Sequence, residues 1–383
     1  MRIGFTTGSC SAAAAKAAAY MLISGREKRE ISILTPKGLE FHPEILDIHR
    51  TEKEVRCAVR KDGGDDPDVT SGALIYATVR YAEDENGNPL EDLEQSEECR
   101  IFLDGGEGVG RVTKPGLDQP VGNAAINSVP RQMILKEVQE VMDVLDYKGA
   151  LSVIISVPEG AEIAEKTFNP RLGIVGGISI LGTSGVVEPM SMQALLDTIQ
   201  VELKQKKALG MESIVIAPGN YGLDFMRETY AYDLDLAVKC SNYIGETLDR
   251  IRDLGFKKVL LCGHIGKLIK VSGGIMNTHS KEADCRIELM VNAGLRCGMP
   301  LDALQEMQGC ISTDAAYEIV KREGVAKEFM EMVMEKIQYY LKKRAADRFE
   351  IECIVFSNEF GLMGKTAGAE DLLNEIKQFG MER

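Results

Sequence analysis

Residues 259–267 read Val-Leu-Leu-Cys-Gly-His-Ile-Gly-Lys, a short apolar run that ends in a glycine and a histidine. A second run, Ser213 to Ala217, ends in a similar way at Pro218-Gly219. Short apolar runs bounded by glycine or proline indicate buried strands. Helical periodicity occupies about 191–208 and 236–254. Strands that alternate with helices predict a parallel sheet, with ligand sites at the carboxyl ends of its strands.

The first half of the chain has a different pattern. Its segments, in order, are a helix from about Ser9 or Ser11 to Ser24 with Gly25 as its stop, alternating strands at 31–34 and 55–59, further strands within 69–81 and at 101–103, an acidic loop at 83–98, an amphipathic helix at 128–145 and a buried strand at 151–157. This order predicts a layered α+β domain over residues 1–165 and an α/β domain over residues 166–383.

Composition excludes several classes of protein. The chain has 383 residues and a net charge of -14, which makes it a poor general binder of nucleic acid. No uncharged apolar run reaches the roughly 18 residues that a membrane span needs. The nine cysteines are scattered without C-x-x-C pairs and the amino terminus does not read as an export signal. We therefore expect reduced thiols and a cytoplasmic location.

Glycine-rich turns follow the strands predicted in the second half. Glycine permits positive φ and close approach of a ligand to the backbone, and Ser and Thr add hydroxyl donors. The alternative is a tight turn that only packs a helix on a strand. If parallel strands bring these turns to one edge, the residues expected to bind a nucleotide-like cofactor are Gly176, Gly177, Gly182, Thr183, Ser184, Gly185, Gly219 and Asn220.

Two turns of the first half carry charge. Residues 103–110, Leu-Asp-Gly-Gly-Glu-Gly-Val-Gly, are typical of a loop that faces an anion, with Arg111 and Lys114 beside it, or of a plain glycine hairpin. The segment Asp62 to Asp68 gathers four carboxylates, which raise one another's pKa. It is consistent with acid–base catalysis, with a divalent cation, or with a solvated turn. Cys262, His264, His279 and Cys285 do not have the spacing of a structural zinc site.

Five segments recur together in one known family. They are FTTGSCSAAAAK (5–16), GGDDPDVT (63–70), GGEGVGRVTKPGL (105–117), NPRLGIVGGISILGTSG (169–185) and GHIGKL (263–268). In this order they resemble the CbiD family, the cobalt-precorrin-5B C1-methyltransferases of anaerobic cobalamin synthesis. The resemblance extends from residue 3 to about residue 290.

The resemblance implies a fold, a reaction and a set of site residues. It implies a small α+β domain beside a Rossmann-like domain, with S-adenosylmethionine as methyl donor and a cobalt-containing tetrapyrrole as acceptor, converted to cobalt-precorrin-6A. The cobalt belongs to the substrate, so no protein-bound metal is expected. The expected proton acceptors are His264, Glu107 and Asp66, and the cations expected to hold the acceptor's carboxylates are Arg111, Lys114, Arg131 and Lys267.

Two rival functions remain open at this point. One is a nicotinamide-dependent reductase of a corrinoid intermediate, against which the missing G-x-G-x-x-G argues. The other is a corrinoid carrier without catalysis. In each case the partner is a small tetrapyrrole rather than a nucleic acid or a membrane, and a homo-oligomer is compatible with all three functions. If Gly182, Thr183 and Gly185 form the donor pocket, we expect Gly182→Leu to abolish donor binding while leaving the fold intact.

Overall fold

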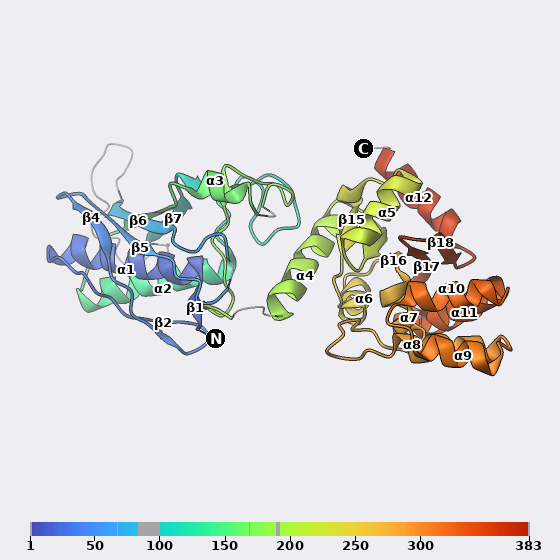
Figure 1. Ribbon diagram of the computed structural model, residues 1–383. Helices are drawn as coiled ribbons and strands as arrows, with labels where there is room; N and C mark the ends of the chain where they lie inside the picture. The colour runs from blue at the N-terminus through green and yellow to red at the C-terminus, as the bar shows by residue number, and fades with distance from the viewer. Residues whose placement is uncertain (1, 67, 83–99, 168, 189–191, 382–383) are drawn as a thin grey trace. The chain divides into compact units, whose positions relative to one another are not determined.

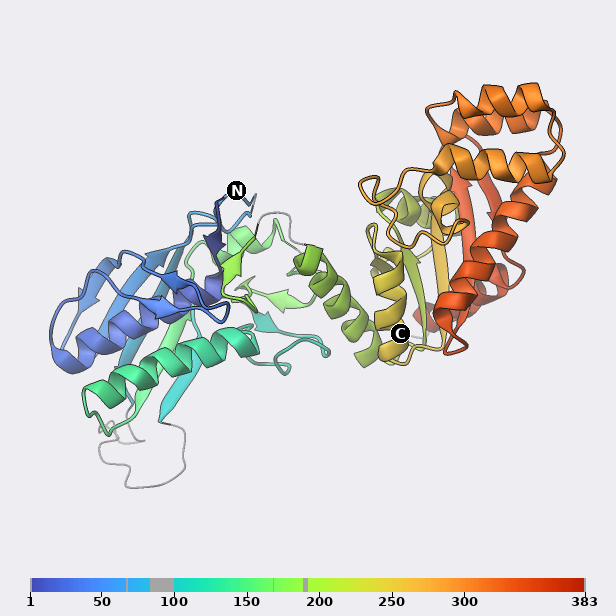
Figure 2. The ribbon, with the colours of Figure 1, turned by 90° about the horizontal axis from the view of Figure 1, so that it is seen from below.

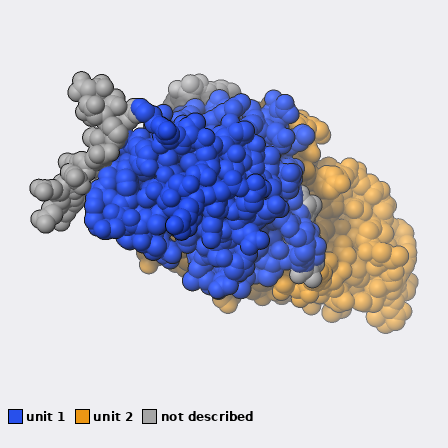
Figure 3. All heavy atoms as spheres, turned by 90° about the vertical axis from the view of Figure 1, so that its left-hand side faces the viewer, with its two compact units in different colours: residues 1–191 blue, residues 192–383 orange. Residues whose placement is uncertain are grey.

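The computed structural model describes residues 2–66, 68–82, 100–167, 169–188 and 192–381. The chain divides into two compact units, Met1–Ser191 and Met192–Arg383 (Figures 1 and 3). Both helices and strands occur in each unit, in agreement with the expected mixed α/β class. The acidic loop expected at 83–98 lies outside the described residues.

Unit 1 is built on a five-stranded sheet of order β4-β5-β6-β10-β7. Neighbouring strands are antiparallel except β10 and β7, which are parallel. The elements are β1 (Gly4–Phe5), α1 (Thr7–Ser24), β2 (Ile33–Leu34), β3 (Glu40–Phe41), β4 (Leu46–Arg50), β5 (Glu54–Arg60), β6 (Leu74–Tyr81), β7 (Ile101–Gly105), β8 (Gly108–Val109), β9 (Arg111–Val112), α2 (Ser128–Val144), β10 (Leu151–Ser156), α3 (Gly160–Ala164), β11 (Ile174–Val175), β12 (Gly177–Ile178) and β13 (Val186–Val187).

Helix α1 forms the centre of this unit. Thr6 caps it by accepting from the Ser9 N–H, and Gly25 ends it with φ of 69°. Its alanines are buried, and their small side chains let the helix backbone come close to the sheet, where Cys57 Sγ donates to Ala14 O at 3.4 Å. Helix α2 packs beside it on the same face (Figure 2). The predicted helices at both places are confirmed.

The expected domain boundary near residue 165 differs from the observed division. Residues 169–188 belong to unit 1, because β11 pairs with β9, β12 with β8 and β13 with β1. The sequence pattern suggested that the run at 172–177 is a strand of the parallel sheet. The structure shows that it is not, because it pairs within unit 1. Its partners lie more than 60 residues away in sequence, so a local pattern does not reveal them.

Unit 2 is built on a second sheet of order β15-β14-β16-β17-β18, in which β18 alone is antiparallel to its neighbour. Its elements are α4 (Met192–Ala208), β14 (Ser213–Ala217), α5 (Asn220–Tyr230), η1 (Leu234–Leu236), β15 (Ala237–Lys239), α6 (Ile244–Asp253), β16 (Lys258–His264), α7 (Ile265–Val271), α8 (Arg286–Arg296), α9 (Leu301–Gln308), α10 (Thr313–Arg322), α11 (Ala326–Ala345), β17 (Glu350–Ser357), β18 (Gly361–Lys365) and α12 (Ala369–Met381). Separate apolar clusters on the two faces of the sheet hold the helices in place.

The prediction of a single helix over 236–254 is wrong. Those residues form the end of η1, strand β15 and then helix α6. Ser241 interrupts the segment with φ of 52°, a conformation that a helix excludes. The apolar spacing fits a helix because Val238 and Cys240 face the same core as Ile244. The spacing of buried residues across a strand and a turn therefore resembles that of a helix.

Candidate functional site

The carboxyl edge of the unit 2 sheet contains the point where the chain reverses its winding. From β14 the chain crosses to β15 on one side, and β16 lies on the other side. In open parallel sheets ligands bind in the crevice at such a reversal, because the two outgoing loops diverge there. The loops concerned are Pro218-Gly219 after β14 and the end of β16 at His264.

These two loops lie side by side. A Cβ placed on Gly263 would come 3.0 Å from Pro218 Cγ. Gly219 has φ of 121°, and a Cβ there would meet nothing within 4 Å, so its open side faces no protein atom. Helix α5 starts at the next residue without a side-chain cap and without an acidic residue in its first turn. A helix amino terminus of this kind favours a negatively charged ligand group.

His264 lies at the junction of β16 and α7. Its Nδ1 accepts the Gly266 N–H at 3.0 Å and so caps α7. Its ring meets that of Phe356 edge-on, with centroids 5.6 Å apart. Burial lowers the pKa of His264, and Asp314 opposes this shift. A neutral ring whose Nδ1 accepts carries its proton on Nε2, so His264 presents a donor at Nε2.

Two lysines extend the same edge. Lys267 Nζ donates to Asn242 Oδ1 at 2.7 Å, and Lys239 Nζ donates to Asn220 Oδ1 at 2.7 Å. Burial lowers the pKa of Lys267; Cys240 opposes this shift, and the nearby cations Lys239 and Lys270 add to it. Asn242 and Asn220 are neutral amides, so this edge keeps a positive potential that suits a carboxylate or phosphate.

The glycine segment 176–185 belongs to unit 1, whereas this sheet edge belongs to unit 2. Several of its glycines are required by packing: a Cβ on Gly177 would lie 2.1 Å from Gly108 O, and one on Gly182 would lie 2.4 Å from Thr6 Oγ1. Gly185 packs against Thr35, and Ser184 Oγ donates to Val186 O. A Cβ on Gly176 would meet nothing within 4 Å, and Thr183 is exposed. Among the expected cofactor residues, Gly219 and Asn220 alone belong to unit 2.

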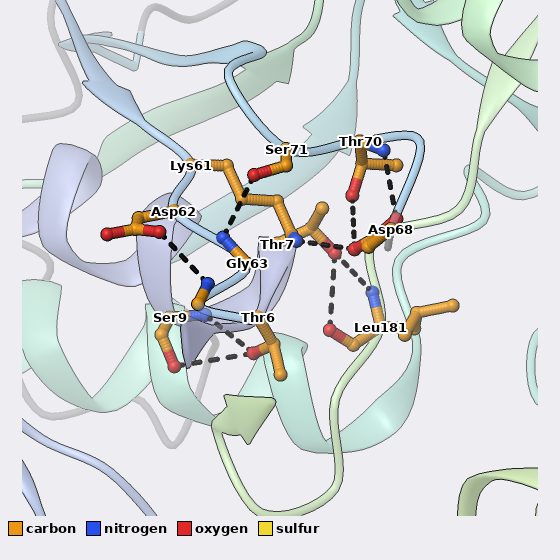
Figure 4. Close-up of polar contacts among 11 residues, drawn as sticks. Thr6, Thr7, Ser9, Lys61, Asp62, Gly63, Asp68, Thr70, Ser71 and Leu181 are labelled. Carbon is orange, nitrogen blue, oxygen red and sulfur yellow. Dashed lines mark hydrogen bonds and ion pairs between the residues drawn. The ribbon is translucent and has the colours of Figure 1, made fainter. Parts of the chain in front are cut away.

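Three distant segments of unit 1 meet at the start of α1 (Figure 4). Thr7 Oγ1 donates to Leu181 O at 3.2 Å and accepts from Leu181 N at 2.9 Å. The buried Lys61 forms an ion pair with Asp68 at 2.5 Å, and Asp68 also accepts from Thr70. The sequence did not predict this contact, although the segments 5–16, 63–70 and 169–185 are among those that carry the family resemblance. Their polar side chains satisfy one another and so hold the segments together.

The candidate acids and cations of unit 1 are partly engaged by the protein itself. Arg111 makes a bidentate ion pair with Asp104, at 2.8 and 2.9 Å, which lowers the pKa of Asp104. Arg131 donates to Leu103 O at 3.3 Å, while its buried Nε has no partner in the part that the structure describes. Glu107 is exposed in the turn between β7 and β8.

The remaining candidates are placed as follows. Asp66 is half-buried in the loop between β5 and β6, and Lys114 Nζ donates to Arg171 O at 3.4 Å. Glu107 and Asp66 belong to unit 1 and His264 to unit 2. The structure therefore does not gather the three expected proton acceptors within one unit. It does gather Gly219, Asn220, His264 and Lys267 at one sheet edge.

Neither a metal cluster nor a membrane-spanning helix occurs among the described residues. They contain no group of three or more His, Cys, Asp or Glu side chains arranged to hold a metal. No helix in the described ranges is long and apolar enough to cross a bilayer. The eight cysteines of these ranges are free thiols, and burial raises the pKa of Cys10 to about 12, which makes it a poor nucleophile.

Comparison with known proteins gives consistent matches. The CbiD family profile matches residues 1–189, and the profile of the CbiD C-terminal domain matches residues 277–367. A cobalt-precorrin-5B C(1)-methyltransferase of Ruminiclostridium cellulolyticum is 44% identical over 98% of this chain and 95% of its own. One of Alkaliphilus metalliredigens is 41% identical over 100% of this chain and 97% of its own.

A solved structure also matches. It is the crystal structure of the cobalamin biosynthesis protein cbiD from Archaeoglobus fulgidus, at 24% sequence identity and a TM-score of 0.37, covering 84% of each chain.

Proposed function

The chain belongs to the CbiD family, and from this membership we infer that it transfers a methyl group to C1 of cobalt-precorrin-5B in cobalamin biosynthesis. The observation that carries the assignment is the similarity at 44% and 41% identity over nearly the full length of both chains. Neither the reductase nor the carrier alternative receives comparable support.

We propose S-adenosylmethionine as the donor. Its sulfonium supplies an electrophilic methyl group, so that a carbon–sulfur bond breaks, a carbon–carbon bond forms at C1, and S-adenosylhomocysteine leaves. The enzyme's part is to hold the reactants in line and to exclude water, which makes positioning the main source of acceleration.

The donor site that we propose is the carboxyl edge of the unit 2 sheet, a Rossmann-like arrangement. Gly219 leaves the backbone open to a ligand, and Asn220 begins an uncapped helix. Lys267 is suited to the carboxylate of the donor's amino-acid part because its partner Asn242 does not neutralise it. His264 is suited to donate from Nε2 to a ribose hydroxyl or a carboxylate.

The acceptor is proposed to bind to unit 1, where Arg111, Lys114 and Arg131 remain candidates for its carboxylates. If attack at C1 requires loss of a proton, Glu107 and Asp66 are better candidates than His264. The reason is that His264 Nδ1 already accepts a backbone N–H, which leaves no free lone pair on the neutral ring.

A calorimetric titration of the full chain with S-adenosylhomocysteine tests the donor site. Lys267→Gln is expected to weaken binding at least about tenfold, the equivalent of about 1.4 kcal/mol, because a charge-assisted hydrogen bond is lost. Lys257→Gln is the matched control, since Lys257 is exposed and precedes the amino end of β16. Equal affinities for wild type and Lys267→Gln would move the donor site elsewhere.

The reaction itself is tested with cobalt-precorrin-5B and isotopically labelled S-adenosylmethionine. We expect one label per acceptor, at C1. A chain that binds the tetrapyrrole but never transfers the label is a carrier. A chain that needs a reduced nicotinamide for turnover is the reductase alternative.

A further inference from the structure

One face of the five-stranded sheet in unit 1 is not covered by α1 and α2. Side chains alternate along each strand, so Cys57, Ile75 and Val153 point toward the helices and join the core. The residues that alternate with the buried ones along the strands, such as Arg56, Arg80 and Ser152, point to the opposite face. This second set defines what we call the open face.

The register of the strands arranges the open face in two rows. The first row runs across the sheet as Glu54, Arg80, Ser152 and Phe102, since each is paired with the next. The second row runs as Arg56, Thr78, Ile154 and Asp104. With neighbouring strands about 4.8 Å apart, four strands give a platform roughly 14 Å wide.

The first row is accessible and lines a hollow. Phe102 is 50% exposed although it lies within a strand, and Arg80, two strands away in the same row, is also exposed. A cavity of about 540 Å³ is lined by Arg80, Phe102, Ser152 and Glu54, together with Lys53, Tyr81 and Ala82. An exposed phenylalanine and an exposed arginine on the same sheet face, two strands apart, suit a flat, acidic molecule.

The two arginines of the open face form no ion pair within the described part of the chain. Arg56 lies over the ring of Tyr76, at 4.2 Å from its centroid. The acidic neighbours are mostly engaged: Asp104 is paired with Arg111, and Asp47 accepts from the Tyr76 hydroxyl at 2.6 Å. This face therefore carries two arginines without an ion pair in the described ranges, with the carboxylate-bearing Glu54 opposite Arg80 in the register.

The glycine turn that follows β7 borders the second row. A Cβ on Gly106 would lie 2.5 Å from Ser156 Oγ and 2.8 Å from Ile154 Cγ2, so only glycine lets the turn lie this close to the sheet. Glu107 follows in the same turn and is exposed. The open face thus ends at a turn that carries a candidate proton acceptor.

We propose that the open face binds the tetrapyrrole, with Phe102 and Ile154 against the macrocycle and Arg56 and Arg80 holding its acetate and propionate carboxylates. This inference rests on the proposed function, because that function supplies a polycarboxylate macrocycle as acceptor. Guanidinium groups suit this task, since they bind carboxylates in a bidentate manner and keep their charge.

The test is an absorbance titration of the full chain with an octacarboxylate porphyrin, which is a stable probe of the same chemistry. Arg80→Gln and Arg56→Gln are each expected to weaken binding at least tenfold, and Phe102→Ala to weaken it with little change in the fold. Arg26 is an exposed arginine just past the end of α1, and the control variant Arg26→Gln is expected to bind the porphyrin as the wild type does. Far-ultraviolet circular dichroism verifies that each variant is folded.

The outcomes separate this inference from the function on which it rests. If the wild type does not bind the porphyrin, or if the Arg80 and Arg56 variants bind it as the wild type does, the open face is not the macrocycle site, whatever the methyl transfer assay shows. If the variants lose binding but the wild type transfers no methyl group, the site stands and the proposed reaction fails.

Discussion

Gly182 and Gly219 both adopt positive φ, yet their surroundings differ. A Cβ on Gly182 would collide with the Thr6 side chain, whereas one on Gly219 would meet open space. The expectation that Gly182→Leu leaves the fold intact is therefore wrong. A glycine that is packed against protein on its bare side serves the fold, and one that is open on that side is free to serve a ligand.

At the same scale, protonation of His264 makes the free energy of unfolding depend on pH. Its folded-state pKa lies below the usual 6.5 because of burial. As pH falls below about 6.5, the unfolded chain takes up the proton more readily than the folded chain, so the free energy of unfolding decreases. We expect this loss to level off below the folded pKa and to be absent above about pH 7.5.

His264→Asn isolates this contribution, because asparagine also caps a helix but does not titrate. We expect wild type and variant to have similar unfolding free energies at pH 7.5, and the wild type alone to lose stability between pH 7 and its folded pKa. Urea unfolding followed by circular dichroism at several pH values measures the difference. Parallel pH curves for the two proteins would contradict the account.

At the scale of elements, the start of α1 depends on a buried ion pair beside it. Burial raises the pKa of Asp68, but hydrogen bonds from Lys61 and Thr70 lower it more, and the net shift is downward. The carboxylate is thus charged in the folded protein and stabilises it above its usual pKa range. That stabilisation is lost as pH falls through the folded pKa.

Lys61→Met is expected to destabilise the protein by about 2–4 kcal/mol, since it leaves a mostly buried carboxylate without its cation. Lys37→Met is the control, because Lys37 and Glu188 form an exposed pair whose loss costs at most about 1 kcal/mol. Urea midpoints of the two variants give the comparison. An equal effect of the two substitutions would show that the buried pair contributes nothing special.

At the scale of the whole molecule, the division between units determines which fragments fold. Residues 169–188 supply the partners of β1, β8 and β9, and Gly185 O accepts from the Thr6 N–H at 3.2 Å. We expect fragment 1–191 to unfold in one cooperative urea transition. Fragment 1–165, which ends at the boundary that the sequence suggested, is expected to lose that cooperativity.

The two fragments are compared by circular dichroism and by resistance to trypsin at equal concentration. Fragment 192–383 serves as the companion, since unit 2 has its own sheet and apolar clusters. Equal cooperativity of fragments 1–165 and 1–191 would mean that the short strand pairs are dispensable.

The sequence by itself determined the family and most of the long helices and strands. The helix expected from about Ser9 or Ser11 to Ser24, observed as Thr7–Ser24, follows from its run of small residues and its stop at Gly25. The strand of residues 213–217 follows from its apolar run and the Pro218-Gly219 stop. It also placed Gly219, Asn220 and His264 just past the ends of apolar runs, and Lys267 within a glycine-containing motif.

Only the tertiary structure decided which distant segments share a surface. It showed that residues 169–188 complete unit 1, that β15 interrupts an apparent helix, and that strand register places Arg56, Arg80 and Phe102 on one face. The physical reason is that hydrogen bonding between strands is non-local. A periodic pattern states which side of a strand is buried, but the partner strand is chosen by the packing of the whole unit.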